Sequence, residues 1–334
     1  MDHATRKKLY RKIERERETK VLAFVTSDRV GMETRIAPDC IDLFVDLLDK
    51  IGPTQRLSLV LHTNGGQTLA AWRLVNLIRT FCDELEVIIP LKALSAGTLI
   101  SIGSDKIVMS KQAALGPIDP SVNNPLNPQA NVGGQLRQVP VSVEAVRGYL
   151  NAAKEELGIK GEQGLAQVLI NLAGYVHPLV LGEIFRSRAQ IKLLAEKLIQ
   201  RQVTDPEKRK TIIDFLSADS GSHDYTINRR EAADLGLNIE KPSAAFYEIL
   251  RKLHQSFVAE LKLLEPYTPQ AVLGNAPANH PVAYTEVRGL VESTGGGCYA
   301  FLSEGTLRRV QVPGPAGVQD GIQDERTFEG WKRL

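Results

Sequence analysis

The sequence predicts an α/β fold in which β-α units repeat with parallel strands, followed by helical additions and a C-terminal β-hairpin. Short apolar runs rich in β-branched residues recur in the first third of the chain, at 21–27, 56–63, 86–91 and 106–109. Stretches with apolar residues at helical spacing separate them. Parallel neighbours need a crossover connection because a tight hairpin reverses the chain, so this alternation predicts parallel pairing.

The first β-α unit begins with residues 21–27 (VLAFVTS), which are short, apolar and β-branched enough for a buried strand. Apolar side chains then recur at the spacing of an amphipathic helix, at Ile41, Phe44, Val45 and Leu48. Ahead of this strand, the charged residues 4–19 place Leu9 and Ile13 on one face. We expect a solvated helix with a thin apolar seam there; a docking helix for a partner or for acidic lipid is the alternative.

Two further units carry a glycine turn after their strand. Residues 56–63 predict a strand, and Asn64-Gly65-Gly66 predict a turn after it. A second helix is predicted from apolar residues that share one face: Ala71, Leu74, Val75, Ile78 and Cys82. Residues 86–91 (EVIIPL) predict the third strand, Ser95 to Gly103 a short helix, and 106–109 (KIVM) a fourth strand.

The second half of the chain is predominantly helical by pattern. Asn, Pro, Gly and Gln dominate from Pro120 to Pro140, and a structureless segment of this length is more often a functional loop than a connector. Apolar spacing predicts helices at 142–157, 162–172, 177–203, 206–216 and 242–264. A linker rich in Pro, Ala and Asn follows, and two strands about Thr294-Gly295-Gly296-Gly297 predict the terminal hairpin.

The composition is that of an ordinary globular protein. Of 334 residues, 43% are apolar and 24% charged, and the formal net charge is +2, so neither disorder nor a nucleic acid partner is indicated. The cysteines Cys40, Cys82 and Cys298 form no C-x-x-C pattern, which argues against a disulfide framework or a zinc site. Without an apolar run of membrane-spanning length, we expect a cytoplasmic protein with no membrane span.

Two glycine turns form the candidate catalytic site. Thr63-Asn64-Gly65-Gly66 and Leu94-Ser95-Ala96-Gly97 follow successive parallel strands and open helices. Ligands gather at the carboxyl ends of such strands, and helix N-termini leave amides unpaired, so one amide from each turn can converge on an oxyanion beside a serine. The alternative makes the glycine pair a tight helix-strand contact and Ser95 an N-cap.

The stretches LHTNGGQTLAAWRLVNLIRT, KALSAGTLISIGSDKIVM, ALGPIDPSV and SHDYTINRREAADLGL together resemble the ClpP/SppA clan of serine peptidases. Within that clan, the sequence is most similar to the serine dehydrogenase proteinase family, over roughly residues 20–240. The resemblance implies a ClpP/crotonase-like fold. It also implies the domain organisation 1–19 N-terminal helix, 20–240 hydrolase domain, 241–264 helix, 265–284 linker and 285–334 hairpin with tail.

Residue by residue, the resemblance makes Ser95 the nucleophile and the amides of Gly66 and Ala96 the oxyanion hole. Asn64 stands where the clan's turn has proline, a change that the backbone tolerates because Asn suits turns. The base is less direct, because ClpP's histidine position falls in LGPIDP, which offers Asp119, while ClpP's aspartate position falls at His223-Asp224. An exchange of roles gives the triad Ser95, Asp119 and His223.

Other bases stay open. His177, at the start of a long helix, is the main alternative, although a histidine beside proline there is more often structural. SppA enzymes use lysine, and Lys92, Lys111 or Lys197 can serve if desolvated. We expect His62 to be a satisfied core histidine.

The sequence therefore predicts a serine peptidase or related hydrolase, an endopeptidase by resemblance, which acts on a peptide or protein through an acyl-enzyme. It needs no cofactor or metal. The resemblance implies a homo-oligomer, with an accessory protein partner as an option. The rival functions are a crotonase-like enzyme acting on acyl thioesters and a catalytically silent binding module.

Overall fold

The computed structural model describes residues 2–118, 121–122, 124–132, 135–219, 225–314 and 317–334. The chain forms two compact units, one made of Met1–Leu115 with Asn228–Leu334 and the other of Gly116–Ile227. The first unit is therefore assembled from both ends of the chain, and the second is a continuous insertion within it. The domain boundaries expected from the sequence, which keep 20–240 together, stay a prediction.

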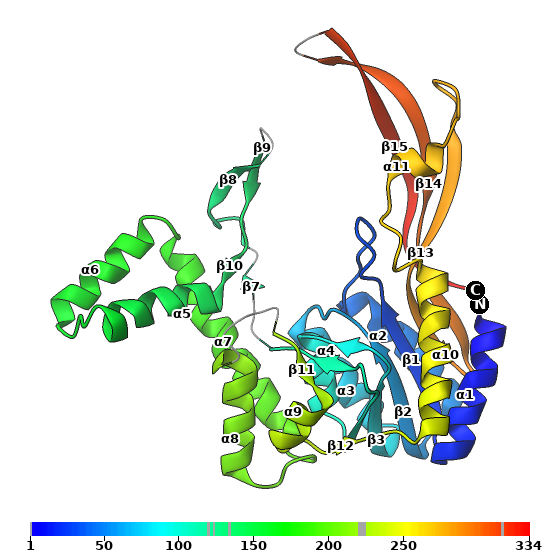
Figure 1. Ribbon diagram of the computed structural model, residues 1–334, viewed down its shortest axis with the longest axis horizontal. Helices are drawn as coiled ribbons and strands as arrows, with labels where there is room; N and C mark the ends of the chain where they lie inside the picture. Colours follow the sequence, from blue (N-terminus) through cyan, green and yellow to red (C-terminus); the bar gives the residue numbers. More distant parts are fainter. Residues whose placement is uncertain (1, 119–120, 123, 133–134, 220–224, 315–316) are drawn as a thin grey trace. The chain divides into compact units, whose positions relative to one another are not determined.

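An eight-stranded mixed sheet forms the centre of the first unit, in the order β12-β5-β3-β2-β1-β13-β14-β15. Its strands are β1 (Lys20–Thr26), β2 (Thr54–His62), β3 (Cys82–Ile89), β5 (Lys106–Met109), β12 (Ile239–Glu240), β13 (Val282–Ser293), β14 (Gly297–Gly314) and β15 (Gly317–Arg333). The strands from β12 to β1 pair in parallel, whereas β13, β14 and β15 join antiparallel. The predicted α/β class with parallel β-α units is confirmed (Figure 1).

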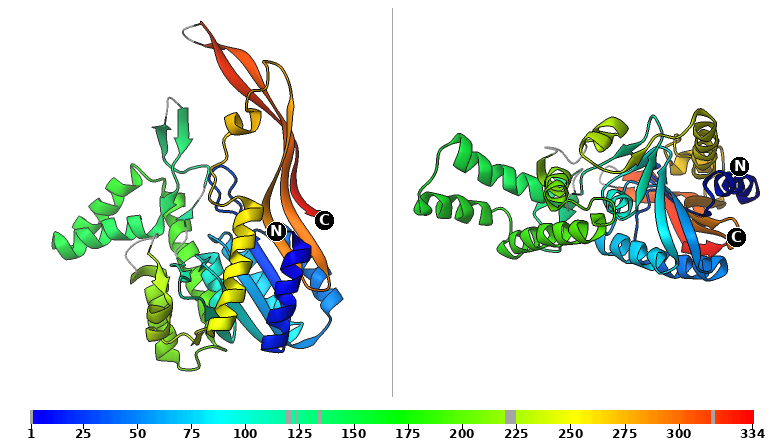
Figure 2. Two further views of the ribbon diagram at one scale, coloured as in Figure 1. Left: turned by 45° about the vertical axis from the view of Figure 1, so that its right-hand side comes forward. Right: turned by 90° about the horizontal axis from the view of Figure 1, so that it is seen from below.

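Helices cover both faces of this sheet (Figures 1 and 2). On one face lie α2 (Ile41–Ile51), α3 (Thr68–Arg79) and α4 (Ala96–Ile102), and the rings of Phe24 and Phe44 meet there at 5.3 Å. On the other face lie α1 (His3–Arg17) and α10 (Ala244–Leu261), which pack on the alternate residues of β1. Because side chains of a strand alternate between faces, neighbouring residues at the strand ends project to opposite layers.

The helix α1 is anchored more firmly than a solvated helix. Its Leu9, Tyr10 and Ile13 belong to the core cluster shared with α10. Arg6 is 1% exposed and donates through Nε and one Nη to both carboxylate oxygens of Glu292, which is 0% exposed. Leu9 and Ile13 form the predicted apolar seam, and the buried pair of Arg6 with Glu292 adds a contact that the sequence did not predict.

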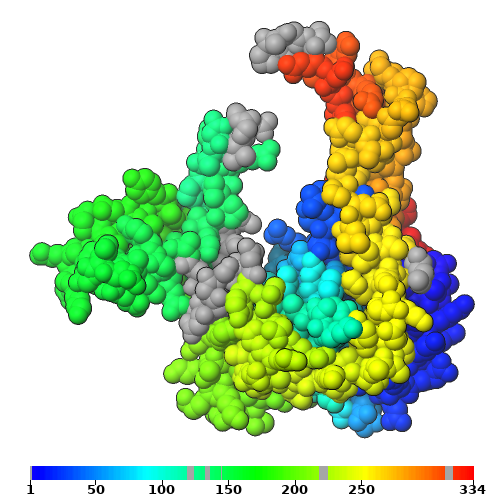
Figure 3. Space-filling model, in the orientation of Figure 1, coloured from blue at the N-terminus to red at the C-terminus, as the bar shows by residue number. Residues whose placement is uncertain are grey.

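The C-terminal part contains more regular structure than the sequence predicts. The expected hairpin is present as β13 and β14, but both strands are longer, and β15 pairs with β14 along nearly its whole length. The expected linker contains the short helix α11 (Pro269–Leu273) and the start of β13. The pair of β14 and β15 projects from the rest of its unit (Figures 1 and 3).

Smaller elements complete the first unit: the 3-10 turn Pro38–Cys40, β4 (Lys92–Ala93), β6 (Ala114–Leu115), α9 (Arg229–Asp234) and, at the boundary with the second unit, β11 (Ile227–Asn228). The strand β4 pairs in parallel with β6.

The second unit has the helices α5 (Val143–Asn151), α6 (Glu162–Ala173), α7 (Pro178–Ile199) and α8 (Pro206–Asp214), close to the predicted ranges. Five-residue π-helical segments follow α5 and α8, at Ala152–Glu156 and Phe215–Asp219. The segment from Pro120 to Pro140, predicted to lack structure, instead contains β7 (Ser121–Val122), which pairs with β10 (Val141–Ser142), and the pair β8 (Gln129–Val132) and β9 (Gln135–Gln138). That prediction was wrong because these strands lack apolar alternation.

Within the described part of the chain, no helix taken singly has both the length and the apolar character needed to cross a bilayer. The helices α6 and α7 meet those criteria only when taken together, and a bend of 106° separates them.

Candidate active site

The glycine turn after β2 depends on two residues that lack a Cβ. Gly65 and Gly66 have φ angles of +108° and +154°, which residues with side chains rarely adopt. Gly66 forms a bridge with Ile36, and a Cβ at Gly66 would lie 2.2 Å from the Ile36 carbonyl oxygen. The turn is therefore held against Ile36 by close backbone contact, with Ile36 N–H bonded to the Gly65 carbonyl and Gln67 N–H to the Ile36 carbonyl.

Ser95 is the residue of strained backbone in the second turn. Its φ of +51° and ψ of −113° lie outside the left-handed helical region that the helix C-caps Glu18 and Lys262 occupy. The Ser95 side chain makes no capping hydrogen bond, although it stands at the N-cap position of α4. The alternative role of Ser95 as a side-chain N-cap is thus not seen, and strained residues of this kind cluster at active sites.

The two turns lie directly against each other. A Cβ at Gly65 would lie 2.8 Å from the Ser95 Cβ and 3.1 Å from the Ala96 nitrogen. This contact has a structural cause: Thr63, directly after β2, forms a parallel bridge with Ala93 in β4, and each turn begins next to this bridge. The structure thus brings Gly65, Gly66, Ser95 and Ala96 together at the carboxyl end of the sheet.

Within the described residues, the backbone N–H groups of Gly66 and Ala96 donate no hydrogen bond. In the first case, the bonds to Ile36 use the carbonyl of Gly65 and the N–H of Gln67, on either side of the Gly66 N–H. In the second, Ala96 is the first residue of α4, where an N–H has no partner inside the helix. Two unpaired donors beside a serine hydroxyl can stabilise a developing oxyanion.

The predicted base and its orienting group, His223 and Asp119, lie outside the described residues. His177 is described, and its Nδ1 accepts a hydrogen bond from the Leu179 N–H at 3.2 Å as the N-cap of α7. With the Nδ1 lone pair engaged, the neutral ring carries its proton on Nε2, which suits a capping role better than proton abstraction.

The lysine alternatives have other contacts. Lys92 forms an ion pair with Asp28, and the ammonium of exposed Lys111 lies 4.6 Å from the centre of the Tyr247 ring. Lys197 lies in the last turn of α7.

A second polar group that the sequence did not predict lies on the face of the sheet covered by α10. His62, 1% exposed, has neither ring nitrogen hydrogen-bonded, and Asp28 Oδ1 and His254 Nε2 are likewise buried without a partner. The rings of His62 and His254 are 5.5 Å apart. The expectation that His62 is satisfied is therefore wrong.

Charge and burial shift the pKa values in this group. Burial alone would raise the pKa of Asp28, but contacts with His62 and Lys92 outweigh it and hold the pKa below its usual range. Burial, followed by the neighbouring His62, lowers the pKa of His254 to about 4. Among the described residues, no group of three or more His, Cys, Asp or Glu side chains is arranged to hold a metal ion.

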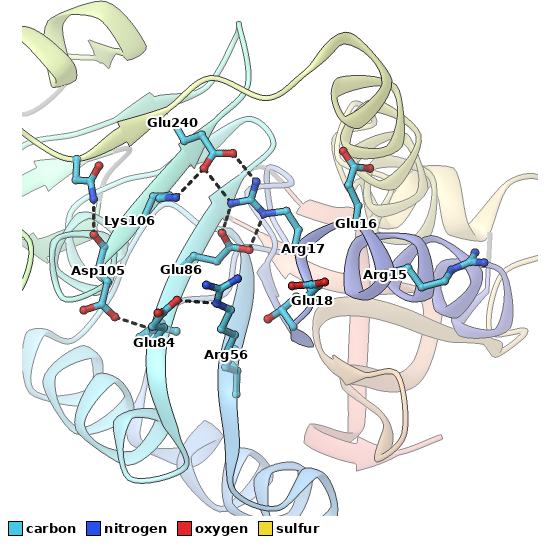
Figure 4. Close-up of a pocket in the computed structure, with 14 residues that line it drawn as sticks. Arg15, Glu16, Arg17, Glu18, Arg56, Glu84, Glu86, Asp105, Lys106 and Glu240 are labelled. Atoms are coloured by element: carbon cyan, nitrogen blue, oxygen red, sulfur yellow. Dashed lines mark hydrogen bonds and ion pairs between the residues drawn. The ribbon is translucent and has the colours of Figure 1, made fainter.

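A separate cavity of about 430 Å³ lies at the amino ends of β2, β3 and β5, whereas the glycine turns follow the carboxyl ends. Figure 4 shows Arg17 held between Glu86 and Glu240, with Lys106 also on Glu240. Four basic and six acidic side chains line this cavity.

Sequence relatives were found for most of the chain. It is 28% identical over 184 residues to the uncharacterized protein MJ0137 of Methanocaldococcus jannaschii, covering 55% of this chain and 53% of that protein, so it spans about half of that relative's length. It is 26% identical over 274 residues to the uncharacterized protein MJ1495 of the same organism, covering 75% of this chain and 77% of that protein.

Solved structures with detectable similarity include the following two. A mutant of the 1510-N membrane-bound stomatin-specific protease has a TM-score of 0.38 and 14% identity, over 73% of this chain and 86% of that one. A mutant of ClpP1 from Listeria monocytogenes has a TM-score of 0.35 and 12% identity, over 70% of this chain and 99% of that one.

The family comparison bears on the segment that contains both turns. Residues 1–132 match the family described as ClpP-like SDH-type serine proteinase. Gly66, Ser95 and Ala96 all fall within this match, and its outcome agrees with the resemblance seen in the motifs. The N-terminal 132 residues of this chain are thus similar to the family of ClpP-like SDH-type serine proteinases.

Proposed function

We propose that the protein is a serine endopeptidase of SppA-like type in which Ser95 forms an acyl-enzyme. The observation that carries the proposal is the meeting of the strained Ser95 turn with the Gly65-Gly66 turn, where two N–H groups are unpaired. The family match over residues 1–132 supports the same chemistry.

In the proposed reaction, the Ser95 hydroxyl attacks the carbonyl carbon of a peptide bond and passes its proton to a base. The carbonyl oxygen becomes an oxyanion and receives hydrogen bonds from Gly66 and Ala96, each worth about 3–4 kcal/mol in comparable sites. The tetrahedral intermediate then collapses, the amine leaves with a proton from the base, and the acyl group stays on Ser95. Water, activated by the same base, releases the acid and regenerates the hydroxyl.

For the base we propose His223, oriented by Asp119, because the order of the LGPIDP and SHDY motifs supports this pair. The side chain of His177 is engaged as a cap, which makes it the weaker candidate. We further propose that the protein is cytoplasmic, as its cysteine pattern and the lack of a membrane-spanning apolar run suggest, and that it works as a homo-oligomer, as the resemblance implies.

A fluorophosphonate probe tests the proposal directly. It should attach to Ser95 with loss of fluoride, and Ser95→Ala should abolish both labelling and peptide hydrolysis while leaving the unfolding curve close to that of the wild type. Ser101→Ala is a control that removes a buried hydroxyl of α4 outside the turn. Undiminished hydrolysis by the Ser95→Ala protein would rule out the proposed nucleophile.

A further inference from the structure

The two donors of the proposed oxyanion hole belong to turns that follow different strands, β2 and β4, so a contact between the turns must fix their relative position. Thr63, the residue after β2, lies between them and is 0% exposed. Its backbone and both branches of its side chain contact the two turns.

The backbone of Thr63 holds the Ser95 turn. Thr63 N–H donates to the Lys92 carbonyl at 3.1 Å, and Leu94 N–H donates to the Thr63 carbonyl at 3.0 Å. Leu94 directly precedes Ser95, so the second of these bonds restrains the residue from which the strained turn begins.

The hydroxyl of Thr63 holds the glycine turn. Its Oγ1 accepts the Gly65 N–H at 2.9 Å and the hydroxyl of Thr26 at 2.7 Å. Gly65 and Thr26 are both buried, so each donor would lack a partner if this oxygen were removed. The bond to Gly65 restrains the peptide that precedes the free N–H of Gly66.

The methyl group of Thr63 supports the third contact, with α4. A Cβ at Gly97 would lie only 2.5 Å from Thr63 Cγ2, so the helix backbone approaches this methyl closely. With Cγ2 against α4 and Oγ1 towards Gly65, the rotamer of this β-branched side chain is fixed.

We propose that Thr63 is a positioning residue that aligns the Gly66 and Ala96 amides around one oxyanion. The inference rests on the proposed function of Ser95. Thr63 is buried and acts through Gly65 and Leu94 without touching substrate. A small displacement of one donor is costly, because hydrogen bonds to an oxyanion depend on its position in the transition state.

The test compares Thr63→Val with Thr63→Ser by the kinetics of fluorophosphonate labelling at Ser95. Valine keeps the methyl against Gly97 but removes the acceptor, and we expect the maximal labelling rate to fall about 10- to 100-fold with little change in the probe's half-saturation concentration. Serine keeps the acceptor and should stay within about 3-fold of the wild type.

Thr26→Val is the matched control, because it removes the donor to Thr63 while Gly65 keeps its acceptor. Its labelling rate should be close to that of the wild type, even if its stability falls. The pH profile of labelling should keep its shape in the Thr63→Val protein, since the base is unchanged.

Several results would overturn the inference. One is a wild-type labelling rate in Thr63→Val, and another is an equal loss in Thr26→Val. If the valine protein does not fold, the serine protein decides: because serine keeps the acceptor for Gly65, a loss of about 10-fold or more there would show that this acceptor does not by itself hold the two turns, and would contradict the inference. Failure of the proposed function would appear separately, as labelling or hydrolysis that survives Ser95→Ala.

Discussion

Asp28, two residues beyond β1, lies near His62, the last residue of β2, with 3.8 Å between Asp28 Oδ1 and His62 Nε2. Neither atom forms a hydrogen bond, and His254 completes a buried group of polar atoms that are only partly satisfied. Because these polar atoms are buried without hydrogen-bond partners, the protonation of the group is coupled to folding.

The first prediction concerns stability between about pH 6.5 and pH 4. Because the pKa of His254 falls to about 4 in the fold, the unfolded chain binds a proton in this window that the native protein does not. The free energy of unfolding should therefore decrease as the pH falls through this range. Urea unfolding at several pH values measures it, and His254→Gln should flatten the dependence.

The contribution of Asp28 to the pH dependence of stability can be separated from that of His254. Its pKa is lower in the fold than in the unfolded chain, so its contribution is present above about pH 4 and is lost only below that value. A decrease between pH 6.5 and pH 4 that is as steep in His254→Gln as in the wild type would contradict the assignment to His254.

The second prediction concerns the glycine turn. Gly66→Ala should lower turnover about 100-fold, because the new Cβ would meet the Ile36 backbone and displace the Gly66 N–H. Gly52→Ala is the control, since Gly52 also has a positive φ, of +71°, but nothing lies within 4 Å of the added Cβ. The control should lose about 1 kcal/mol of stability and keep its activity. Equal turnover in the two variants would show that the Gly66 amide does not face the reacting carbonyl.

The third prediction separates the candidate bases. His223→Ala should cost nearly as much activity as Ser95→Ala, since members of a triad act as a unit. Asp119→Asn should leave residual activity, and the limb of the pH-rate profile near about 6–7 should vanish in His223→Ala. Retention of that limb in His223→Ala together with its loss in His177→Ala would assign the base to His177 instead.

The fourth prediction concerns the buried pair of Arg6 and Glu292. Arg6→Ala leaves a carboxylate in an apolar core with only Tyr10 and Cys298 as hydrogen-bond donors, and should cost about 3–5 kcal/mol of stability. The double variant Arg6→Met with Glu292→Leu removes both charges and should be more stable than Arg6→Ala. Urea unfolding of the single and double variants measures the difference, and a double variant less stable than the single one would refute this account of the pair.

Much of the core was predictable because its signals are local. The apolar runs of β1, β2, β3 and β5 and the stripes of α2 and α3 lie within a few residues of their predicted bounds. In contrast, β15 has few apolar residues, so its composition does not predict a strand. Its structure depends on backbone pairing with β14. The partner of Arg6 lies 286 residues away in sequence, so no window around α1 reveals it.

The candidate site also has a part that was predictable from the sequence and a part that was not. Ser95 and the Gly65-Gly66 turn are linked by short loops of consecutive β-α units, and their meeting follows from parallel pairing. The buried contacts of Asp28, His62 and His254 were not predictable, because α10 approaches β2 from the far end of the chain. The base depends on segments outside the described residues, and the sequence supplies its identity only through resemblance.

The strand β1 can pair with its neighbour β13 only after most of the chain has been synthesised. Leu22 pairs with Ser293 in β13, while its other side pairs with β2. On the ribosome, β1 and β2 emerge long before β13, so the nascent sheet presents an open, largely apolar strand edge throughout synthesis of the insertion. Closure of that edge is a contact of very long sequence separation and forms slowly. Until β13 is made, the open edge of β1 can pair with strands of other chains, and a circular permutant beginning at β13 would shorten this exposure.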